Sequence, residues 1–291
     1  MNSGNGGSKP AARSPRFPLP LGKMGGASAS SSASSGVGGG VAREVLMPQR
    51  HLREAAQDAA RQLAPSGLGL DSAKVRQRMV LRLRRDGLHD ERVLEALSRV
   101  PRHEFVDSAL AIQAYEDTSL PIGHEQTISK PSVVGRMIAM LFGGQSASQR
   151  GHLGRTLEIG TGCGYQAAVL ALLSQSLVSI ERLKPLHDKA RSNLAPLHLP
   201  QVRLIYGDGR LGAPGAAPFD SIVAAAGGDD IPSAWLEQLA PGGRLIAPMA
   251  APGGRGQVLV RVDHLLENGR SRFVRTEHEA VLFVPLKSGV M

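Results

Sequence analysis

Two short stretches of this 291-residue chain hold most of the residues that could do chemistry. The first is the polar run "GHEQTISKP", residues 123–131, which leads into an apolar segment that begins at a proline. The second, further along, is the glycine-rich run "LEIGTGCGYQ", residues 157–166. Glycines let a backbone approach a ligand closely, so the second run is typical of a nucleotide-binding turn. The role of a polar loop placed shortly before such a turn is the first question that the chain raises.

The glycine-rich run joins a strand-like segment to a helix-like segment through Gly160, Thr161, Gly162 and Gly164. The glycines permit a tight turn, and the N-terminus of a helix offers free backbone N–H donors. A tight turn without a ligand is the alternative interpretation. The spacing is G-x-G-x-G, whereas a dinucleotide-binding turn needs G-x-G-x-x-G. A dehydrogenase is therefore disfavoured.

Acidic residues surround this turn. Glu158 precedes it, Glu181 ends the next strand-like run, and Asp208 with Gly209 follows the third. A carboxylate such as Glu181 can accept hydrogen bonds from both ribose hydroxyls, although a solvated acid at a strand end is the alternative for that residue alone. Acids after successive strands predict a pocket for a nucleoside with a cationic tail, which suits S-adenosylmethionine better than NAD. Cys163 is the single cysteine, so we expect no multi-cysteine metal site and name no metal ligand.

Strand-like and helix-like segments alternate from residue 151 onward. The expected strands are 155–159, 177–180, 202–206, 219–225 and 244–248, and the expected helices are 164–174, 185–194 and 232–239. This alternation predicts an α/β fold with a doubly wound, mostly parallel sheet of the Rossmann-like methyltransferase type, with ligands at the carboxyl ends of the strands. Runs 256–264 and 272–286 predict a C-terminal β extension. Upstream, apolar periodicity predicts N-terminal helices, one starting near Asp71 and stopping at Gly87, one closed by Pro101 and one begun by Pro131.

The first 70 residues differ in composition from the rest. Gly and Ser make up 19 of the first 40 residues, and no acid precedes Glu44. Such a segment cannot bury enough apolar surface to order itself, so we expect residues 1–70 to be a disordered basic tail and linker. An organelle transit peptide is an alternative that the glycine content disfavours. The remainder, 71–291, is predicted to be one methyltransferase domain: helices and acceptor-side loop in 71–150, cofactor-binding core in 151–250 and C-terminal strands in 251–291.

The net charge of +9 would suggest a nucleic-acid partner if the charge lay on the folded part. Residues 1–70 carry eight Lys or Arg against three Asp or Glu, whereas the remaining residues carry 26 against 22. Aromatic residues make up only 3% of the chain. We therefore expect no specific nucleic-acid partner. No run of about eighteen apolar residues and no apolar signal core is present, so we also expect no membrane partner and a cytoplasmic protein. Separately, we expect the protein to be a monomer.

With these motifs in order, the chain resembles the protein-L-isoaspartate O-methyltransferase family from about residue 71 to residue 286. The run "LPIGHEQTISKP" is similar to the loop that precedes the family's methyltransferase fold, and "LEIGTGCGYQ" to its first methyltransferase motif. The runs "APFDSIVAAAGGDDIP", "LAPGGRLIAPM" and "VLFVPL" resemble its later motifs and its closing strand. A glycine loop alone is shared by many methyltransferases, but these runs in this order are far more specific.

The resemblance implies transfer of a methyl group from S-adenosylmethionine to the α-carboxyl of L-isoaspartyl residues in damaged proteins and peptides, which then repair through a succinimide. It places Thr127, Ile128 and Ser129 between methyl donor and acceptor, with Ser129 as the active-site serine. The cofactor's methionine and ribose parts then lie at residues 160–164 and Glu181, and its adenine at Asp208 and Gly209. Without the resemblance, a helix-start residue is the alternative interpretation of Ser129.

Two departures from the family pattern concern the site. Glu125 stands where a small residue is usual and adds a negative charge near a site for an anionic acceptor, and Ala225 stands where many members have a hydroxyl residue. Two other functions stay open: a methyltransferase for a different small-molecule or RNA acceptor, and a cofactor-binding protein without catalysis. The intact Thr127–Ser129 run beside an intact glycine turn disfavours the latter.

Overall fold

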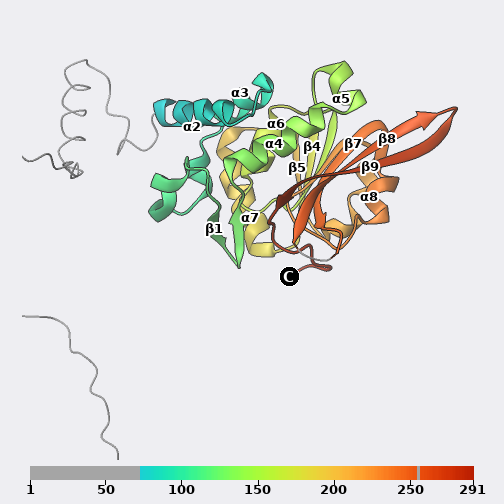
Figure 1. Ribbon diagram of the computed structural model, residues 1–291. Coiled ribbons are helices and arrows are strands. Elements are labelled where there is room, and N and C mark those ends of the chain that lie inside the picture. Colours follow the sequence, from blue (N-terminus) through green and yellow to red (C-terminus); the bar gives the residue numbers. More distant parts are fainter. Residues whose placement is uncertain (1–72, 254–255) are drawn as a thin grey trace, which may run out of the picture. The chain divides into compact units, whose positions relative to one another are not determined.

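The central sheet is built from the strands that the sequence predicts. The computed structural model describes residues 73–253 and 256–291, all within the unit Leu52–Met291. Seven strands form one sheet in the order β5-β4-β3-β6-β7-β8-β9 (Figure 1). Their bounds are β3 (Arg155–Ile159), β4 (Ser176–Glu181), β5 (Val202–Tyr206), β6 (Phe219–Ala224), β7 (Leu239–Ala250), β8 (Gln257–Glu267) and β9 (Arg270–Val281). Strands β3 to β7 are parallel, and β8 and β9 add an antiparallel extension.

The strand order creates a crevice at the centre of the sheet. The chain adds β4 and β5 on one side of β3 and then returns to add β6 and β7 on the other side. After β3 and β6 the chain thus leaves toward opposite edges of the sheet. In open parallel sheets this switch point, at the carboxyl ends of the strands, is where ligands bind. The glycine-rich turn follows β3 directly and therefore lies at this place.

Helices cover the sheet and lead into it. Between the strands run α6 (Tyr165–Ala171), α7 (Lys184–Leu194) and α8 (Ser233–Glu237), with short 3-10 turns η4 (Ala195–Leu197), η5 (Gly209–Leu211) and η6 (Pro214–Ala216). Upstream lie α2 (Ala73–Arg85), α3 (Glu91–Arg99), η2 (Arg102–Phe105), η3 (Ser108–Gln113), α4 (Pro131–Phe142) and α5 (Gln145–Arg150). Asp90 caps α3 by accepting from the backbone N–H groups of Arg92 and Val93. A small antiparallel hairpin, β1 (Leu120–Gly123) and β2 (Gln126–Ile128), precedes α4.

The central strands of the sheet are buried on both faces. Val223 and Ile246 belong to a core cluster that includes the N-terminal helices and α6, whereas the adjacent Ile222 and Leu245 belong to a second cluster around Trp235. Neighbouring residues of a strand point to opposite faces, so each cluster fills one side of the sheet. This two-sided burial explains why the central strands read as continuous apolar runs. The predicted doubly wound α/β fold is confirmed.

Two strand predictions were wrong in extent. Strand β7 is longer than the expected 244–248, because it pairs with β6 from Leu239 and with β8 as far as Ala250. The run through residue 286 is not one strand: β9 ends at Val281, and beyond it only Pro285 forms an isolated bridge, to Gly227. A proline has no N–H to donate to a ladder, which limits pairing there. The closing-strand expectation for 282–286 therefore fails.

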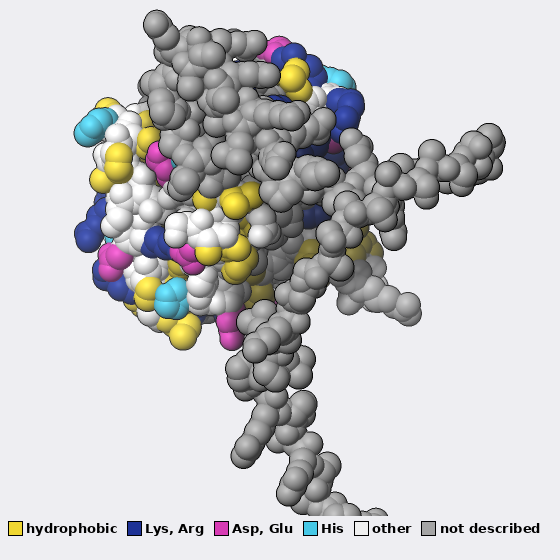
Figure 2. All heavy atoms as spheres, turned by 90° about the vertical axis from the view of Figure 1, so that its left-hand side faces the viewer, with side chains coloured by type: hydrophobic (Ala, Val, Ile, Leu, Met, Phe, Trp, Pro, Cys, Tyr) yellow, Lys and Arg dark blue, Asp and Glu magenta, His cyan; other side chains and the backbone are white. Residues whose placement is uncertain are grey.

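Several expectations concern residues that the structure does not describe. The tail 1–70, its boundary with the following domain and the helix start at Asp71 lie outside the described residues. Within the described ranges, none of the helices combines the length and the apolar character needed to cross a membrane. Where described atoms are visible in Figure 2, Lys and Arg side chains are interspersed with acidic and apolar ones.

Candidate active site

The glycine-rich turn after β3 has a backbone that only glycine adopts easily. Gly160, Gly162 and Gly164 have φ angles of +90°, +56° and +93°. A side chain at Gly162 would also come within 3.2 Å of Ile122 in the β1–β2 hairpin. We call residues 160–164 the glycine loop. The missing side chains let the hairpin approach this loop and leave its backbone accessible to a ligand.

A buried chain of hydrogen bonds links the glycine loop to strands β3 and β4. The hydroxyl of Ser179 donates to Glu158 Oε2 at 2.5 Å and lies 2.6 Å from the hydroxyl of Thr161. Glu158 is fully buried, and this desolvation raises the pKa of its carboxyl to about 8. The hydrogen bond from Ser179 and the nearby amide of Gln166 act in the opposite direction, and the charge of Glu181 raises the pKa further. Glu158 itself does not line the cavity described below, so its contact with the loop is indirect.

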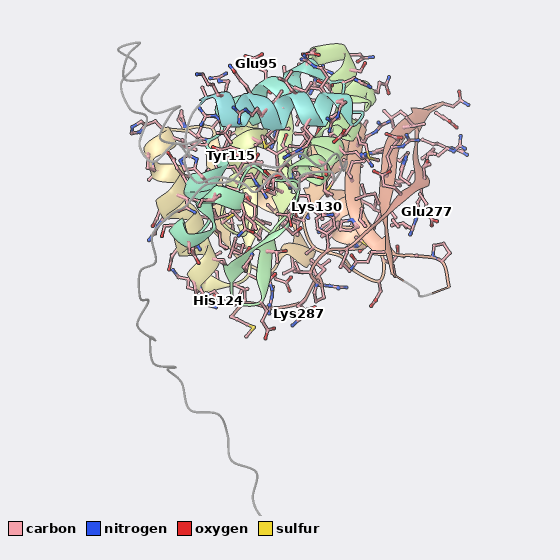
Figure 3. The ribbon with its side chains drawn as sticks, turned by 60° about the vertical axis from the view of Figure 1, so that its left-hand side comes forward. Glu95, Tyr115, His124, Lys130, Glu277 and Lys287 are labelled. Carbon is pink, nitrogen blue, oxygen red and sulfur yellow. The ribbon has the colours of Figure 1, made fainter. Side chains whose placement is uncertain are left out.

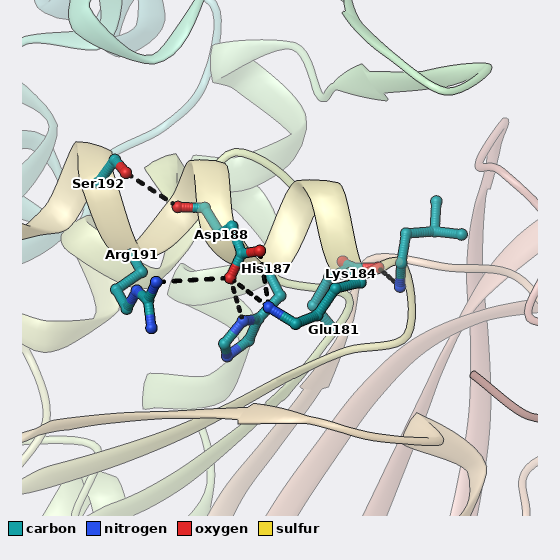
Figure 4. A network of polar contacts seen from close by, with 7 residues as sticks. Glu181, Lys184, His187, Asp188, Arg191 and Ser192 are labelled. Atoms are coloured by element: carbon teal, nitrogen blue, oxygen red, sulfur yellow. Dashed lines mark hydrogen bonds and ion pairs between the residues drawn. The ribbon is translucent and has the colours of Figure 1, made fainter. Parts of the chain in front are cut away.

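Glu181 at the end of β4 joins the glycine loop to helix α7. Its Oε2 accepts from the backbone N–H of Gly162 and its Oε1 from that of Leu183, both at 2.9 Å. Figure 4 shows Glu181 beside Lys184, where α7 begins. These bonds fix the carboxylate at the crevice without using all of its lone pairs, since an ionised carboxylate has about four acceptor positions. Glu181 lines the cavity and can still accept hydrogen bonds from a diol, which fits the predicted ribose contact.

Asp208 and Gly209, after β5, are placed differently from each other. Gly209 lines the cavity, and its carbonyl accepts from the indole N–H of Trp235 at 2.8 Å. The carboxylate of Asp208 accepts from the backbone N–H groups of Arg210 and Gly289 and is not part of the cavity lining. In this structure the C-terminal segment therefore occupies one oxygen of the acid expected at the adenine.

A cavity of about 410 Å³ lies at the switch point, between the glycine loop and the β1–β2 hairpin. It is lined by residues of the glycine loop, Glu181 and Gly209, by residues 124–129 of the hairpin, and by residues 284–287 of the C-terminal segment. Figure 3 shows His124, at the hairpin tip, and Lys287, in the C-terminal segment, at the same edge of the molecule. The structure thus brings the two chemistry-bearing stretches of the sequence into one cavity.

The hairpin and the residues after it form the second wall, which we call the acceptor loop, residues 120–130. Ile128 is buried, Thr127 is exposed and Ser129 is half-buried, and all three line the cavity. The backbone carbonyl of Ser129 accepts from Arg102 Nη2 at 2.8 Å. Lys189 of α7 donates to the carbonyl of Ile122 at 3.2 Å and so links this loop to the cofactor side.

The two departures noted in the sequence lie at this cavity. Glu125 and His124 form the tip of the hairpin with φ angles of +58° and +53°, a conformation that costs energy for residues other than glycine. Glu125 is exposed at the cavity edge, so its charge meets solvent as well as any ligand. Ala225 packs against the glycine loop, within 3.6 Å of where a side chain on Gly160 would lie.

Sequence reasoning missed several cavity residues and their supports. Tyr165, Gln166 and the segment 284–287 line the cavity, and Arg102 and Lys189 hold its acceptor wall. The run around Arg102, "RVPRHEFV", mixes charged and apolar residues and gives no signal that this arginine is buried. The contacts of Lys189 and of 284–287 join segments far apart in the chain, and spacing alone does not reveal such contacts.

The described residues contain no group of three or more His, Cys, Asp or Glu placed to hold a metal ion. Burial raises the pKa of the Cys163 thiol, which keeps it protonated and fits the role of a small filler in the glycine loop. No serine of the cavity has a histidine as a hydrogen-bond partner among the described residues. The cavity offers positioning groups, backbone donors and a carboxylate. Such a site suits a reaction between an electrophile and a nucleophile that are already reactive when they bind.

Comparisons with known proteins agree with this description. A family model described as "Protein-L-isoaspartate(D-aspartate) O-methyltransferase (PCMT)" matches residues 74–291. The protein-L-isoaspartate O-methyltransferase of Methylibium petroleiphilum is 56% identical over 283 residues, which cover 97% of this chain and 98% of the relative. The enzyme of the same name from Leptothrix cholodnii is 60% identical over 242 residues, 83% of each chain.

Solved structures give the same result for the fold. A structure named protein-L-isoaspartate O-methyltransferase superposes with a TM-score of 0.63 at 26% identity and covers 74% of this chain and 67% of that one. A putative protein-L-isoaspartate O-methyltransferase from Plasmodium falciparum, solved in complex with S-adenosyl-L-homocysteine, gives 0.61 at 23% identity and covers 73% and 98%. The family match over the described fold and the close relatives show that this chain belongs to the protein-L-isoaspartate O-methyltransferase family, whose members use S-adenosylmethionine.

Proposed function

We propose that this chain transfers a methyl group from S-adenosylmethionine to the α-carboxyl of L-isoaspartyl residues, and that Ser129 positions the acceptor. The observation that carries the proposal is the shared cavity, in which residues 126–129 face the glycine loop and Glu181. The names of the close relatives support the same reaction. The acceptor peptide lies along the acceptor loop and the cofactor along the glycine loop.

The residues of the cavity fit the cofactor. The open backbone of residues 160–163 accommodates its methionine part, Glu181 has acceptor positions left for the ribose hydroxyls, and Gly209 lines the far end, where the adenine lies. Gly164, expected at the cofactor, is not part of the cavity lining and packs toward Leu194 of α7. Asp208 joins the adenine site only if its bond to Gly289 is exchanged. When bound, S-adenosylmethionine supplies a methyl group activated by the sulfonium charge.

The reaction requires little from the protein besides alignment of the acceptor carboxylate with the methyl group. A carboxylic acid with a pKa near 3.9 is ionised at neutral pH, so the acceptor arrives as a carboxylate and needs no general base. The carboxylate oxygen forms the new bond to the methyl carbon as the carbon–sulfur bond breaks, and the sulfonium and carboxylate charges cancel. Holding such reactants in line is worth roughly 7–11 kcal/mol. Ser129 contributes a hydroxyl that orients the carboxylate, and it does not act as a nucleophile.

Methyl transfer to matched synthetic peptides tests the proposal. One peptide contains an isoaspartyl residue, the second normal aspartate, and the third an isoaspartyl linkage whose α-carboxyl is converted to an amide. We expect base-labile methyl ester to form on the first peptide alone. Equal transfer to the aspartyl peptide, transfer to the amide, or no transfer by protein that still binds the cofactor would contradict the proposal, and the last result would point to a different acceptor.

We also propose that residues 71–291 form the working domain and that the protein is a monomer of the cytoplasm. The family match over residues 74–291 supports the domain boundary. Light scattering of the purified chain and cell fractionation test the other two statements. A dimer at micromolar concentration, or recovery outside the cytoplasmic fraction, would overturn them.

A further inference from the structure

Arg102 is a buried cation directly behind the acceptor loop. It lies in η2, its side chain is 0% exposed, and its neighbours Val100, Phe105 and Val106 belong to the core. A charge buried in this way is costly unless hydrogen bonds or an opposite charge compensate it. The contacts of this guanidinium therefore show what the fold gains by keeping it there.

Three contacts join Arg102 to three separate segments. Its Nε donates to the carbonyl of Ala114 at 2.7 Å, and its Nη2 donates to the carbonyl of Ser129 at 2.8 Å. The guanidinium carbon lies 4.6 Å from the ring centre of Tyr165, the first residue of α6 and part of the cavity wall. One side chain thus ties the acceptor loop to the helix that follows the glycine loop.

The charge of Arg102 has no partner of opposite sign among the described residues. It makes no ion pair there, and its Nη1 is buried without a hydrogen bond. Asp117 acts only as a charge at longer range, since both of its oxygens accept hydrogen bonds from Ser132. A carboxylate bound at the acceptor loop would bring the missing negative charge close to this guanidinium.

Ser129 depends on this contact because little else holds its backbone. Strand β2 ends at Ile128 and α4 begins at Pro131, so Ser129 lies in a two-residue connection outside both elements. The Arg102 bond is the contact that fixes its carbonyl among the described residues. A fixed carbonyl restricts the rotation of the adjoining backbone and hence the direction of the Ser129 side chain.

We propose that Arg102 is a positioning residue for methyl transfer, which holds Ser129 in the orientation that aligns the acceptor carboxylate. This inference rests on the proposed function, because it assumes a carboxylate acceptor oriented by Ser129. Arg102 acts through Ser129 and through its field, without touching the reacting atoms. Its removal therefore affects the acceptor side and leaves the cofactor side unchanged.

A double-mutant cycle between Arg102 and Ser129 tests the proposal. Arg102→Lys keeps the charge but loses the planar fork that donates in two directions at once. We expect it to lower kcat/KM for the isoaspartyl peptide by about 10- to 100-fold, since a misplacement near 1 Å can cost that much. The cofactor Kd should stay within about threefold, because a partial cation–π contact to Tyr165 is retained. In the Ser129→Ala background the same substitution should cost less than about threefold, because no hydroxyl is left to misplace.

Arg92→Lys is the matched control, because Arg92 also lies over an aromatic ring, that of Phe142, but away from the cavity. It should leave both constants unchanged. Circular dichroism and thermal melts set the assay temperature below the lowest melting point of the series. An equal loss in both backgrounds, no loss in either, or a parallel loss of cofactor affinity would overturn the proposal. A wild-type chain that methylates no isoaspartyl peptide would instead contradict the proposed function itself.

Discussion

The glycine loop and the acceptor loop face each other across one cavity but are held in different ways. The glycine loop is fixed mainly by nearby elements: Gly160 and Thr161 donate to the carbonyl of Ile180 in the adjacent strand, and Gly162 donates to Glu181 at the end of that strand. The acceptor loop is fixed by side chains from elsewhere, Arg102 before it and Lys189 after it. One wall therefore follows from the sheet, and the other depends on two long side chains.

The supporting charges also differ in sign. A carboxylate, that of Glu181, anchors the wall that receives a cationic sulfonium cofactor, and the neutral carboxyl of Glu158 supports it from behind. Cations, those of Arg102 and Lys189, anchor the wall that receives an anionic carboxylate. Each wall thus carries a charge opposite to that of its ligand, which stabilises the bound reactants in place. The two walls should therefore fail separately: substitutions in the glycine loop and its supports should lower cofactor affinity, and substitutions in the acceptor loop and its supports should lower turnover.

The largest effect is expected from Glu181→Gln. The amide keeps one acceptor for the two backbone N–H groups, loses the charge and presents an NH₂ group to the other donor. An unsatisfied buried donor of this kind costs about 1–3 kcal/mol. We expect the cofactor Kd, measured by calorimetry, to rise roughly 10- to 100-fold, while the turnover at saturating cofactor falls much less. Glu237→Gln, at an exposed position on α8, is the control. A large fall in turnover with unchanged cofactor affinity would contradict the assignment of Glu181 to the cofactor-binding wall.

Ser129→Ala should give the opposite result, with an effect of comparable size on turnover. One hydrogen bond to a charged group is worth about 1.5–3 kcal/mol, so kcat should fall roughly 10- to 100-fold. The cofactor Kd should stay within about threefold, because no described cofactor-side residue bonds to Ser129. Ser192→Ala, on the exposed side of α7, serves as the control for loss of a hydroxyl. Weaker cofactor binding at unchanged turnover would show that Ser129 supports cofactor binding and does not position the acceptor.

The buried carboxyl of Glu158 gives a pH-dependent test of the first wall. Its pKa is about 8 in the folded chain against an ordinary value of 4.5, because burial favours the neutral form. Between these values the folded chain keeps a proton that the unfolded chain releases, so this group makes stability fall as pH rises from about 5 to 8. Glu158→Gln cannot ionise. Its melting temperature relative to the wild type should therefore increase across this window, and Glu267→Gln, at an exposed position, should show no such trend. A constant difference across the window would mean that Glu158 is not held neutral.

The smallest effect is expected at the hairpin tip. Glu125→Gly removes both the charge and the positive-φ strain, whereas Glu125→Gln removes only the charge. Both should lower the KM for an isoaspartyl peptide by roughly two- to fivefold at low salt, and high salt should remove the difference because exposed charges are screened. Only the glycine variant should change the melting temperature, and by little, since relief of strain is offset by a more flexible unfolded chain. A KM gain in the glycine variant alone would assign the effect to backbone shape.

Much of the fold was predictable from local sequence, and the difference between the two walls shows why. Strand Arg155–Ile159 was predicted with its observed bounds, because a buried parallel strand is a short apolar run followed by glycines. The glycine loop and Glu181 were predictable for the same reason: their spacing follows the strands. The cavity position of residues 127–129 was expected only through the family resemblance.

The supports of the acceptor wall were not predictable from spacing. Arg102 reads in the sequence as an ordinary surface charge, and only the fold shows it with no exposed area. Lys189 meets Ile122 across 67 positions of the chain. Segment 282–286 reads as a strand from its apolar residues, but the bonds of Phe283 go to the side chain of Gln257 instead of a strand partner. Such contacts depend on tertiary packing, which local patterns do not encode.

One measurement tests the separation of the two walls most directly. The cofactor Kd and the single-turnover rate of methyl transfer to an isoaspartyl peptide would be determined side by side for the wild type, Glu181→Gln and Ser129→Ala. We expect Glu181→Gln to change chiefly the cofactor Kd and Ser129→Ala to change chiefly the rate of methyl transfer. If both variants change the same constant to the same extent, the cavity works as a single unit and the proposed division between its walls is wrong.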